Sequence, residues 1–507
     1  MLAHMLSFAV YQNGKPADRI NLAGAYVIGN DDVALRAEVT AKNGVIQCKK
    51  RATGPSGLVI LWRVPDVGEI LLETVRLMER KEPYVLQVEL ARGRLMRLSH
   101  KIEEWGLIDY EGTEALMRSA DDAKELLIKA LQSDTPAEAA DLGDQALTLA
   151  VQTSEAFSQF HASVFFDRRK TTSGFTRRVF GCSIELDRPT ELAPKRLLEA
   201  VDFVTVPTVW RDIEPNEQSF NWKPLDTWIE ALAKQRIPIK CAPLLSFREQ
   251  HVPDWLYIWE HDFDTIRDLA FEHMRRVINR YGQYVQMWDV ISGIHANNCF
   301  TFNFEQLMEL TRMAAALTKQ VASRSVVIID LIAPWGEYYA RNQRTIPPLL
   351  YADMAVQSGV SFDAFGLQFH FGGAADSQYV RDMFQISSII DQFGKLGKPL
   401  HITAVQVPSS TKVSVDRDQG GTKKKLEGGS WHAPWSERVQ ADWLERFWEV
   451  SLSKPFMESV SWLGLTDHKS LPSPHGGLLS SGFAPKAAYE KMREMRNALH
   501  KPDKATG

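Results

Sequence analysis

The sequence predicts an α/β protein whose larger part is a parallel (β/α)8 barrel, a TIM barrel, preceded by an N-terminal β-rich, sandwich-like unit and a helical hairpin. From about residue 178 onwards, short apolar runs alternate with amphipathic helical patterns, and this alternation is typical of a parallel sheet. The run 285–292 is almost continuously apolar, as a strand covered on both faces requires. Eight strand–helix units fit into roughly 320 residues, a usual length for such a barrel.

The barrel is predicted to occupy residues 175–500. Its strands are expected at 179–186, 203–209, 237–246, 285–292, 326–333, 364–371, 400–407 and 460–466. Helical patterns separate them, for example at 263–281, 304–321, 379–394 and 437–452. Function in this fold lies at the carboxyl ends of the strands, so the last residues of each strand are the candidates for chemistry.

Residues 1–110 are predicted to form the β-rich unit. Short apolar or alternating runs recur at 5–11, 25–28, 34–39, 58–64 and 85–90, and turn signals such as Asn13-Gly14 and Asn43-Gly44 separate them. Strands at this spacing favour a small sandwich. Two interpretations stay open: an accessory carbohydrate-binding module, or a packing domain that caps the barrel.

Residues 111–170 are predicted to form the helical hairpin. The segment 113–133 has apolar residues at helical spacing, and a capping-box pattern at 135–138, with Pro136 at the first helical position, begins the second helix. The polar segment 168–174 is predicted to be a linker.

Composition argues against several classes of partner. The net charge of −4 leaves no basic excess for a nucleic acid, and the lysine run 423–425 is interpreted as a solvated loop. No apolar run approaches the roughly 18 residues of a membrane span, and the first residues lack a signal-peptide pattern. We therefore expect neither nucleic-acid nor membrane binding and a cytoplasmic location, with export left open.

The four cysteines are scattered and include no C-x-x-C pair, so the sequence predicts no metal site and no disulfide framework. No cofactor is expected, and the oligomeric state is left open.

Several short segments in the barrel region together resemble one enzyme family. Residues 288–293 read W-D-V-I-S-G, 210–215 read W-R-D-I-E-P, 366–370 read G-L-Q-F-H, 402–406 read I-T-A-V-Q, and 462–467 read W-L-G-L-T-D. Taken in chain order, each on its expected strand or directly after it, they resemble glycoside hydrolase family 10, the retaining xylanases. The resemblance covers about two thirds of the chain. It implies a TIM barrel and an oligosaccharide or polysaccharide ligand of the xylan or β-1,4-glycan type.

The same resemblance places the family's catalytic acid/base at Gly293 and its nucleophile at Ala404. Retaining hydrolysis needs two carboxyl groups about 5–5.5 Å apart, one to protonate the leaving oxygen and one to attack the anomeric carbon. Neither glycine nor alanine supplies one. We therefore expect a protein of the family's fold that has lost this hydrolysis and binds carbohydrate in the old cleft.

Two rival hypotheses stay open. In the first, the chain is an active hydrolase whose acid/base groups have moved, with candidates Asp330, Glu337, Asp467, His370 and His295. In the second, the barrel is a structural or assembly scaffold whose cleft is filled by Phe247, Phe369 and the loop 409–430. The composition of that loop predicts mobility, and its position predicts a lid over the barrel mouth.

Candidate substrate-binding residues combine polar groups with aromatic platforms. Gln368 and His370 match a family pair that supports the nucleophile, while Asp289 is expected to be a buried, paired carboxylate. The flat faces of tryptophan suit the apolar face of a sugar ring. The expected substrate-binding set is Gln368, His370, Trp335, Trp431, Trp435 and Trp462.

Overall fold

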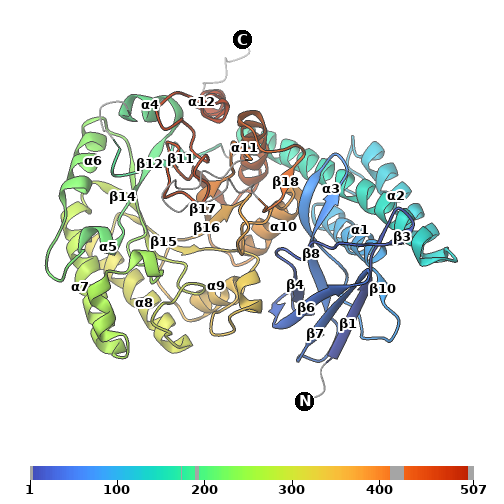
Figure 1. Ribbon diagram of the computed structural model, residues 1–507. Coiled ribbons are helices and arrows are strands. Elements are labelled where there is room, and N and C mark those ends of the chain that lie inside the picture. Colours follow the sequence, from blue (N-terminus) through green and yellow to red (C-terminus); the bar gives the residue numbers. More distant parts are fainter. Residues whose placement is uncertain (1–3, 173, 189–192, 412–426, 501–507) are drawn as a thin grey trace, which may run out of the picture.

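The computed structural model describes residues 4–172, 174–188, 193–411 and 427–500. Within them, parallel strands close a barrel in the order β11-β12-β13-β14-β15-β16-β17-β19, and helices surround it (Figure 1). The strands are β11 Phe180–Ser183, β12 Phe203–Pro207, β13 Ile239–Ala242, β14 Val285–Ser292, β15 Val326–Leu331, β16 Ala364–His370, β17 Leu400–Gln406 and β19 Met457–Trp462. The predicted TIM barrel is confirmed.

The helices of the barrel follow the predicted alternation. They are α4 Ala193–Ala200, α5 Trp210–Ile213, α6 Lys223–Lys234, α7 Phe263–Tyr281, α8 Phe304–Val321, α9 Pro348–Gln357, α10 Met383–Gly394, α11 Glu437–Leu452 and α12 Ala487–His500. Strand β14 and helices α7, α8 and α11 begin and end where the sequence pattern predicts. Side chains such as Phe203, Met287 and Ile328 fill the barrel interior, so strands buried on both faces read as continuous apolar runs.

The N-terminal part is β-rich, as predicted, and forms two main sheets. One has the order β10-β1-β7-β6 and the other β18-β9-β8-β4-β5. Their strands are β1 His4–Ala9, β4 Tyr26–Ile28, β5 Ala34–Leu35, β6 Ala37–Lys42, β7 Val45–Lys50, β8 Gly57–Val64, β9 Gly68–Glu73, β10 Tyr84–Val85 and β18 Ser430–Trp431, and a small hairpin pairs β2 Tyr11–Gln12 with β3 Lys15–Pro16. Phe8 of β1 and Ile60 of β8 share one buried cluster.

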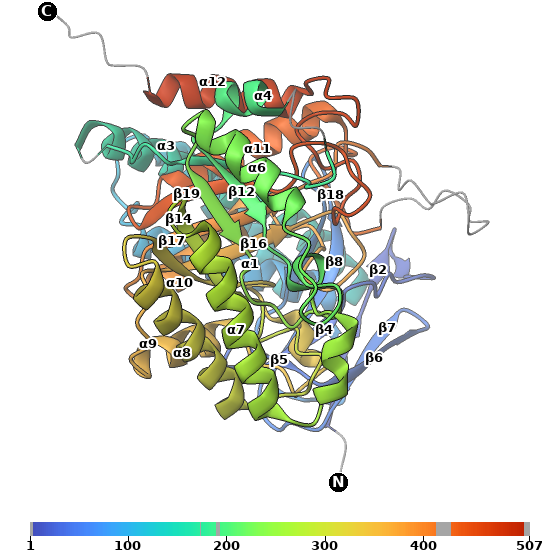
Figure 2. The ribbon, with the colours of Figure 1, turned by 90° about the vertical axis from the view of Figure 1, so that its left-hand side faces the viewer.

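The second sheet is also covered on its other face, by the barrel. Val59 and Leu61 of β8 form a buried cluster with Tyr379, which lies between β16 and α10. In Figure 1 this sheet lies next to the barrel, and in Figure 2 it lies behind the barrel helices α6 and α7. The N-terminal unit is therefore packed against the barrel along a whole sheet face.

The chain also returns to this sheet after the barrel strand β17. Ser430 and Trp431 form β18 and pair with Glu69 and Gly68 of β9. Gly68 has φ +117°, and a Cβ atom there would lie 2.2 Å from the carbonyl oxygen of Ser430, so only glycine permits this approach. Residues 412–426, which include the lysine run and most of the predicted lid, lie outside the described residues.

Three helices connect the sheets to the barrel: α1 Leu86–Glu104, α2 Glu114–Gln132 and α3 Pro136–Thr172. The hairpin α2–α3 was predicted. The strand predicted at 85–90 is wrong beyond Val85, because Leu86 and Leu90 continue a helical spacing to Leu98 and Ile102, all buried. A short apolar run does not by itself separate strand from helix.

The prediction of a linker at 168–174 is also wrong for residues 168–172, because these residues belong to α3, which continues to Thr172. Arg169 explains the extension, since its guanidinium donates hydrogen bonds to the carbonyl oxygens of Leu452 and Lys454 at the end of α11. The last turn of α3 is thereby held on the barrel. The domain limits at 110 and 170 stay a prediction.

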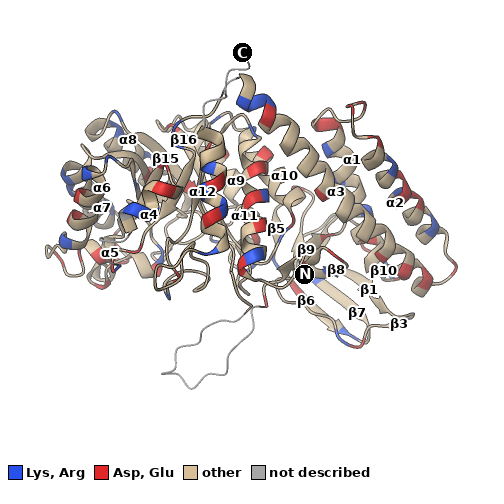
Figure 3. Ribbon diagram, turned by 90° about the horizontal axis from the view of Figure 1, so that it is seen from above, with Lys and Arg blue, Asp and Glu red and all other residues tan. Residues whose placement is uncertain are grey.

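A buried ion pair joins the helices to the barrel. Arg94 of α1 binds Asp382, the N-cap residue of α10, and both side chains are at most 1% exposed. On the surface, acidic and basic residues are interspersed along the outer helices (Figure 3). No helix among the described residues has both the length and the apolar character needed to span a bilayer.

Candidate ligand-binding cleft

A cleft of about 1260 Å³ opens at the carboxyl ends of the barrel strands. Its lining comes from the ends of most barrel strands and from the segment 468–472 after β19. Apolar side chains such as Ile184 and Leu463 alternate in this lining with polar ones such as Asn221, Arg248 and His251. This mixture of apolar walls and convergent polar groups is typical of a small-molecule site.

Asp330, at the end of β15, organises the floor of the cleft. Its carboxylate accepts hydrogen bonds from the hydroxyl of Ser292 on β14, the amide of Gln368 on β16 and the hydroxyl of Thr403 on β17. All four residues line the cleft. Because side chains at the ends of three strands donate hydrogen bonds to this one buried carboxylate, Asp330 holds the floor of the cleft together.

A second buried carboxylate, Asp289, also lines the cleft and is paired. Lys240 of β13 donates to Asp289 of β14 over 2.9 Å, and both side chains are 2% exposed. Burial raises the pKa of Asp289, while the ammonium group of Lys240 acts in the opposite direction. Asp289 is thus the buried, paired carboxylate that the sequence predicts.

The two family catalytic positions flank Asp330 and contain no carboxyl group. Gly293 follows β14 with φ +62°, and a Cβ atom there would lie 2.9 Å from Cδ1 of Ile332. Ala404 of β17 lines the cleft but is only 7% exposed. A side chain at position 293 would therefore crowd Ile332 at its Cβ atom and would need a left-handed backbone conformation.

The predicted replacement acids and bases are scattered rather than brought together. Asp330 and His370 line the cleft. Glu337 is buried in an ion pair with Arg381 over 2.9 Å, and Asp467 pairs with Lys486 over 2.6 Å. His295 is 1% exposed and bonds the carbonyl of Ile332.

His370 sits in the cleft wall with Gln368. Its Nε2 atom lies 3.3 Å from Oε1 of Gln368. Burial, and to a smaller extent the positive charge of Arg248, lowers the pKa of His370 to about 4. At neutral pH the imidazole is uncharged, so it contributes a hydrogen-bonding group to the cleft and is a weak base.

The tryptophans expected to stack on sugar do not line the cleft in the described part of the chain. Trp462 is fully buried and bonds the carbonyl of Gly476, Trp435 bonds that of Gly429, and Trp431 bonds Glu155 of α3. Trp335 packs on Phe369, Phe371 and the guanidinium of Arg381. This corrects the expectation of stacking in the cleft, because Trp431, Trp435 and Trp462 are buried in protein and the half-buried Trp335 lines a different cavity.

The sequence reasoning missed Glu185, which follows β11 and lines the cleft. Its Oε2 accepts a hydrogen bond from the hydroxyl of Thr466 over 3.0 Å, whereas Oε1 is buried without a partner among the described residues. Burial raises the pKa of Glu185 to about 7, although the hydrogen bonds from Thr466 act to lower this pKa. Its place at the end of the first barrel strand was the signal that could have found it.

Phe247 and Phe369 do not fill the cleft. Phe247 packs on Phe300 and Phe302, and Phe369 on Phe447. Among the described residues, no group of three or more histidine, cysteine, aspartate or glutamate side chains is arranged to hold a metal ion.

The fold and the cleft define a TIM-barrel protein with an open cleft at the carboxyl ends of its strands, and these strand ends carry the resemblance described above. The model of glycosyl hydrolase family 10 matches residues 207–495, more than half of the 507 residues. The chain belongs to glycosyl hydrolase family 10.

The relatives and solved structures that this chain is similar to include xylanases of low identity. Endo-1,4-beta-xylanase 1 of Gibberella zeae is 20% identical over 226 residues, 41% of this chain and 60% of that enzyme. Endo-1,4-beta-xylanase B of Thermotoga neapolitana is 20% identical over 296 residues, 56% of this chain and 77% of that enzyme. The crystal structure of xylanase 10B from Thermotoga petrophila with xylobiose has 16% identity and a TM-score of 0.45, covering 63% of this chain and 93% of that one.

Proposed function

We propose that the barrel cleft binds an oligosaccharide of the xylan or β-1,4-glycan type and does not cleave it by the family's retaining reaction. The observation that carries this proposal is an open cleft of mixed apolar and polar lining, with Gly293 and Ala404 at the two family catalytic positions. The xylanase relatives supply the class of ligand.

The cleft lining supports binding of hydroxyl-rich rings. Arg248 and His251 offer donors, and His370 and Asn221 offer donors or acceptors. Arg248 has no side-chain hydrogen-bond partner among the described residues, so it is available to a ligand. Ile184 and Leu463 form apolar wall on which C–H faces of sugar rings can pack.

The rival of relocated catalysis has one observation in its favour. Glu185 lines the cleft with a pKa raised to about 7 by burial, and a carboxylic acid that is half protonated near neutral pH suits a general acid. A second, nucleophilic or basic carboxylate would have to come from Asp187, Asp212, Asp289 or Asp330, which also line the cleft. Conversion of Glu185 to Gln tests this rival directly.

The hypothesis of a structural scaffold predicts a filled cleft, whereas the cleft formed by the described residues is open.

Isothermal titration calorimetry with xylohexaose tests the binding proposal. His370→Ala is expected to weaken binding in the cleft at least tenfold. The matched control is His261→Ala, because the side chain of His261 is 94% exposed and lies outside the cleft. Absence of binding to the cleft, or equal affinity for wild type and His370→Ala, would contradict the proposal.

A further inference from the structure

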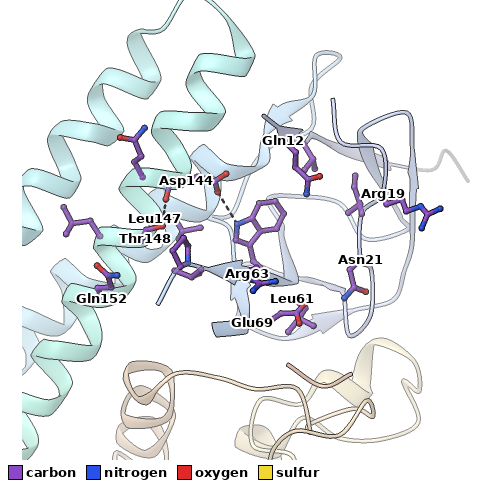
Figure 4. A pocket seen from close by; sticks show the side chains of 17 residues that line it. Gln12, Arg19, Asn21, Leu61, Arg63, Glu69, Asp144, Leu147, Thr148 and Gln152 are labelled. Atoms are coloured by element: carbon purple, nitrogen blue, oxygen red, sulfur yellow. Dashed lines mark hydrogen bonds between the residues drawn. The ribbon is translucent and has the colours of Figure 1, made fainter. Parts of the chain in front are cut away.

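The N-terminal sheet and helix α3 enclose a second cavity of about 650 Å³, within the range of small-ligand sites. Its walls come from the end of β8, the segment 19–21 and the first part of α3 (Figure 4). Among the described residues it shares no lining residue with the barrel cleft. It is therefore a separate site, which we call the Trp62 pocket.

Trp62 is the aromatic wall of this pocket. Leu58 and Ile60 lie on the same face of β8 and are buried in the core, but at Trp62 this face opens into the cavity and the ring is only half-buried. The indole N–H donates to Oδ1 of Asp144 on α3 over 3.2 Å. This bond fixes the ring and satisfies its polar atom, so the remaining open surface of the ring is apolar.

Polar side chains surround the ring. Gln12, Arg63 and Gln152 have no side-chain hydrogen-bond partner among the described residues, and all line the pocket. Asn21 accepts from the backbone of Ala23 through Oδ1, so its amide N–H groups remain available. Figure 4 shows Gln152 on α3 and Asn21 on the opposite side of the cavity. Carboxamides both donate and accept, as sugar hydroxyls do.

We propose that the Trp62 pocket binds a neutral oligosaccharide, with the apolar face of one sugar ring on the indole and its hydroxyl groups on the surrounding carboxamides. The charges of the lining are mixed, with Arg19 and Arg63 against Glu69 and Asp144, so the pocket has no excess charge for a phosphate-bearing ligand. This second site goes beyond the proposed function. Only the choice of β-1,4-linked probes rests on it.

The test is calorimetric titration of the full chain with xylohexaose and with cellohexaose. Wild type is expected to show a site that Trp62→Ala weakens at least tenfold. Gln12→Ala/Gln152→Ala, which keeps the ring, is expected to weaken the same site at least fivefold. Circular dichroism shows whether loss of Trp62 disturbs the fold. If it does, the double variant, which keeps Trp62, still tests the pocket. Trp259→Ala is the matched control, because Trp259 is 39% exposed and lines neither cavity.

The outcomes separate the two sites. A site that persists in His370→Ala and disappears in Trp62→Ala supports the pocket whether or not the cleft binds sugar. If binding depends on His370 but is unchanged in Trp62→Ala and in Gln12→Ala/Gln152→Ala, the proposal of a site in the Trp62 pocket is overturned. The proposal for the cleft is then unaffected. Absence of binding to both sugars overturns both.

Discussion

Ser292 donates a hydrogen bond of 2.5 Å to Asp330 across the pairing of β14 and β15. Ser292 directly precedes Gly293, and Thr403, which also donates to Asp330, directly precedes Ala404. Both strand ends that carry the family's catalytic positions are therefore tied to one buried carboxylate. We infer that Asp330 fixes the floor of the cleft rather than taking part in proton transfer.

Asp330→Ala should lower the free energy of unfolding by about 3 kcal/mol, because buried donors on Ser292, Gln368 and Thr403 lose their acceptor. Urea unfolding measures this loss. Asp254→Ala is the control, since Asp254 is 79% exposed in its pair with Arg211 and should change stability by less than about 1 kcal/mol. Equal stabilities of the two variants would show that the floor does not depend on Asp330.

Gly293→Glu/Ala404→Glu should not restore hydrolysis of xylohexaose. The backbone at 293 has φ +62° and Cδ1 of Ile332 lies 2.9 Å from the new Cβ, so strain alone should cost Gly293→Glu about 1–2 kcal/mol. Ala404→Glu, without a positive φ, serves as the single-site comparison. Reducing-sugar release and urea unfolding check both statements. The prediction would be wrong if the double variant released xylose oligomers at a rate that rises in proportion to its concentration.

Glu185 should make stability fall as pH rises. Its folded pKa of about 7 exceeds the ordinary value of 4.5, so the folded state binds more protons between these values and loses stability as pH increases. The raised pKa corresponds to about 3 kcal/mol. The quantity to compare is the free energy of unfolding of Glu185→Gln minus that of wild type. This difference should be larger at pH 8 than at pH 4.5 by about 3 kcal/mol. A wild-type-to-variant difference that is the same at both pH values would refute the shift.

Arg94→Met should destabilise the protein by about 3–5 kcal/mol, because Asp382 would remain buried without its partner. Arg211→Met is the matched control, as its pair with Asp254 is 42% and 79% exposed, and exposed pairs contribute little. Chemical unfolding of both variants measures the contrast. If Arg94→Met unfolds at the same urea concentration as Arg211→Met, the buried pair does not hold α1 to α10.

The barrel was predictable because its signals are local. The apolar run of β14 and the amphipathic patterns of α7 and α8 each lie within one stretch of sequence. Helix α1 was missed because its first residues, Leu86–Leu90, fit a short strand as well as a helix, and only the later repeat to Ile102 separates the two.

The cleft was only partly predictable. Asp330 was a candidate because it ends a barrel strand, and Gln368 and His370 were candidates because they match a family pair; all three line the cleft. Trp431 was misplaced because its strand partner Gly68 and its hydrogen-bond partner Glu155 are remote in sequence, and long-range pairing leaves no local pattern. Glu185 also follows a strand, but it lies in none of the family motifs, which mark positions 293 and 404 as the catalytic ones.

The central claim is that the cleft holds sugar without cleaving it, and prolonged incubation of purified protein with xylohexaose tests this most directly. Mass spectrometry of sugar and protein should show intact hexasaccharide and no glycosyl adduct on the chain, while the Thermotoga petrophila xylanase serves as the active control. Shorter oligosaccharides that form in proportion to the protein, and that still form after repurification, would contradict the claim. If Glu185→Gln then abolished them, the catalytic acid would lie at the end of the first barrel strand.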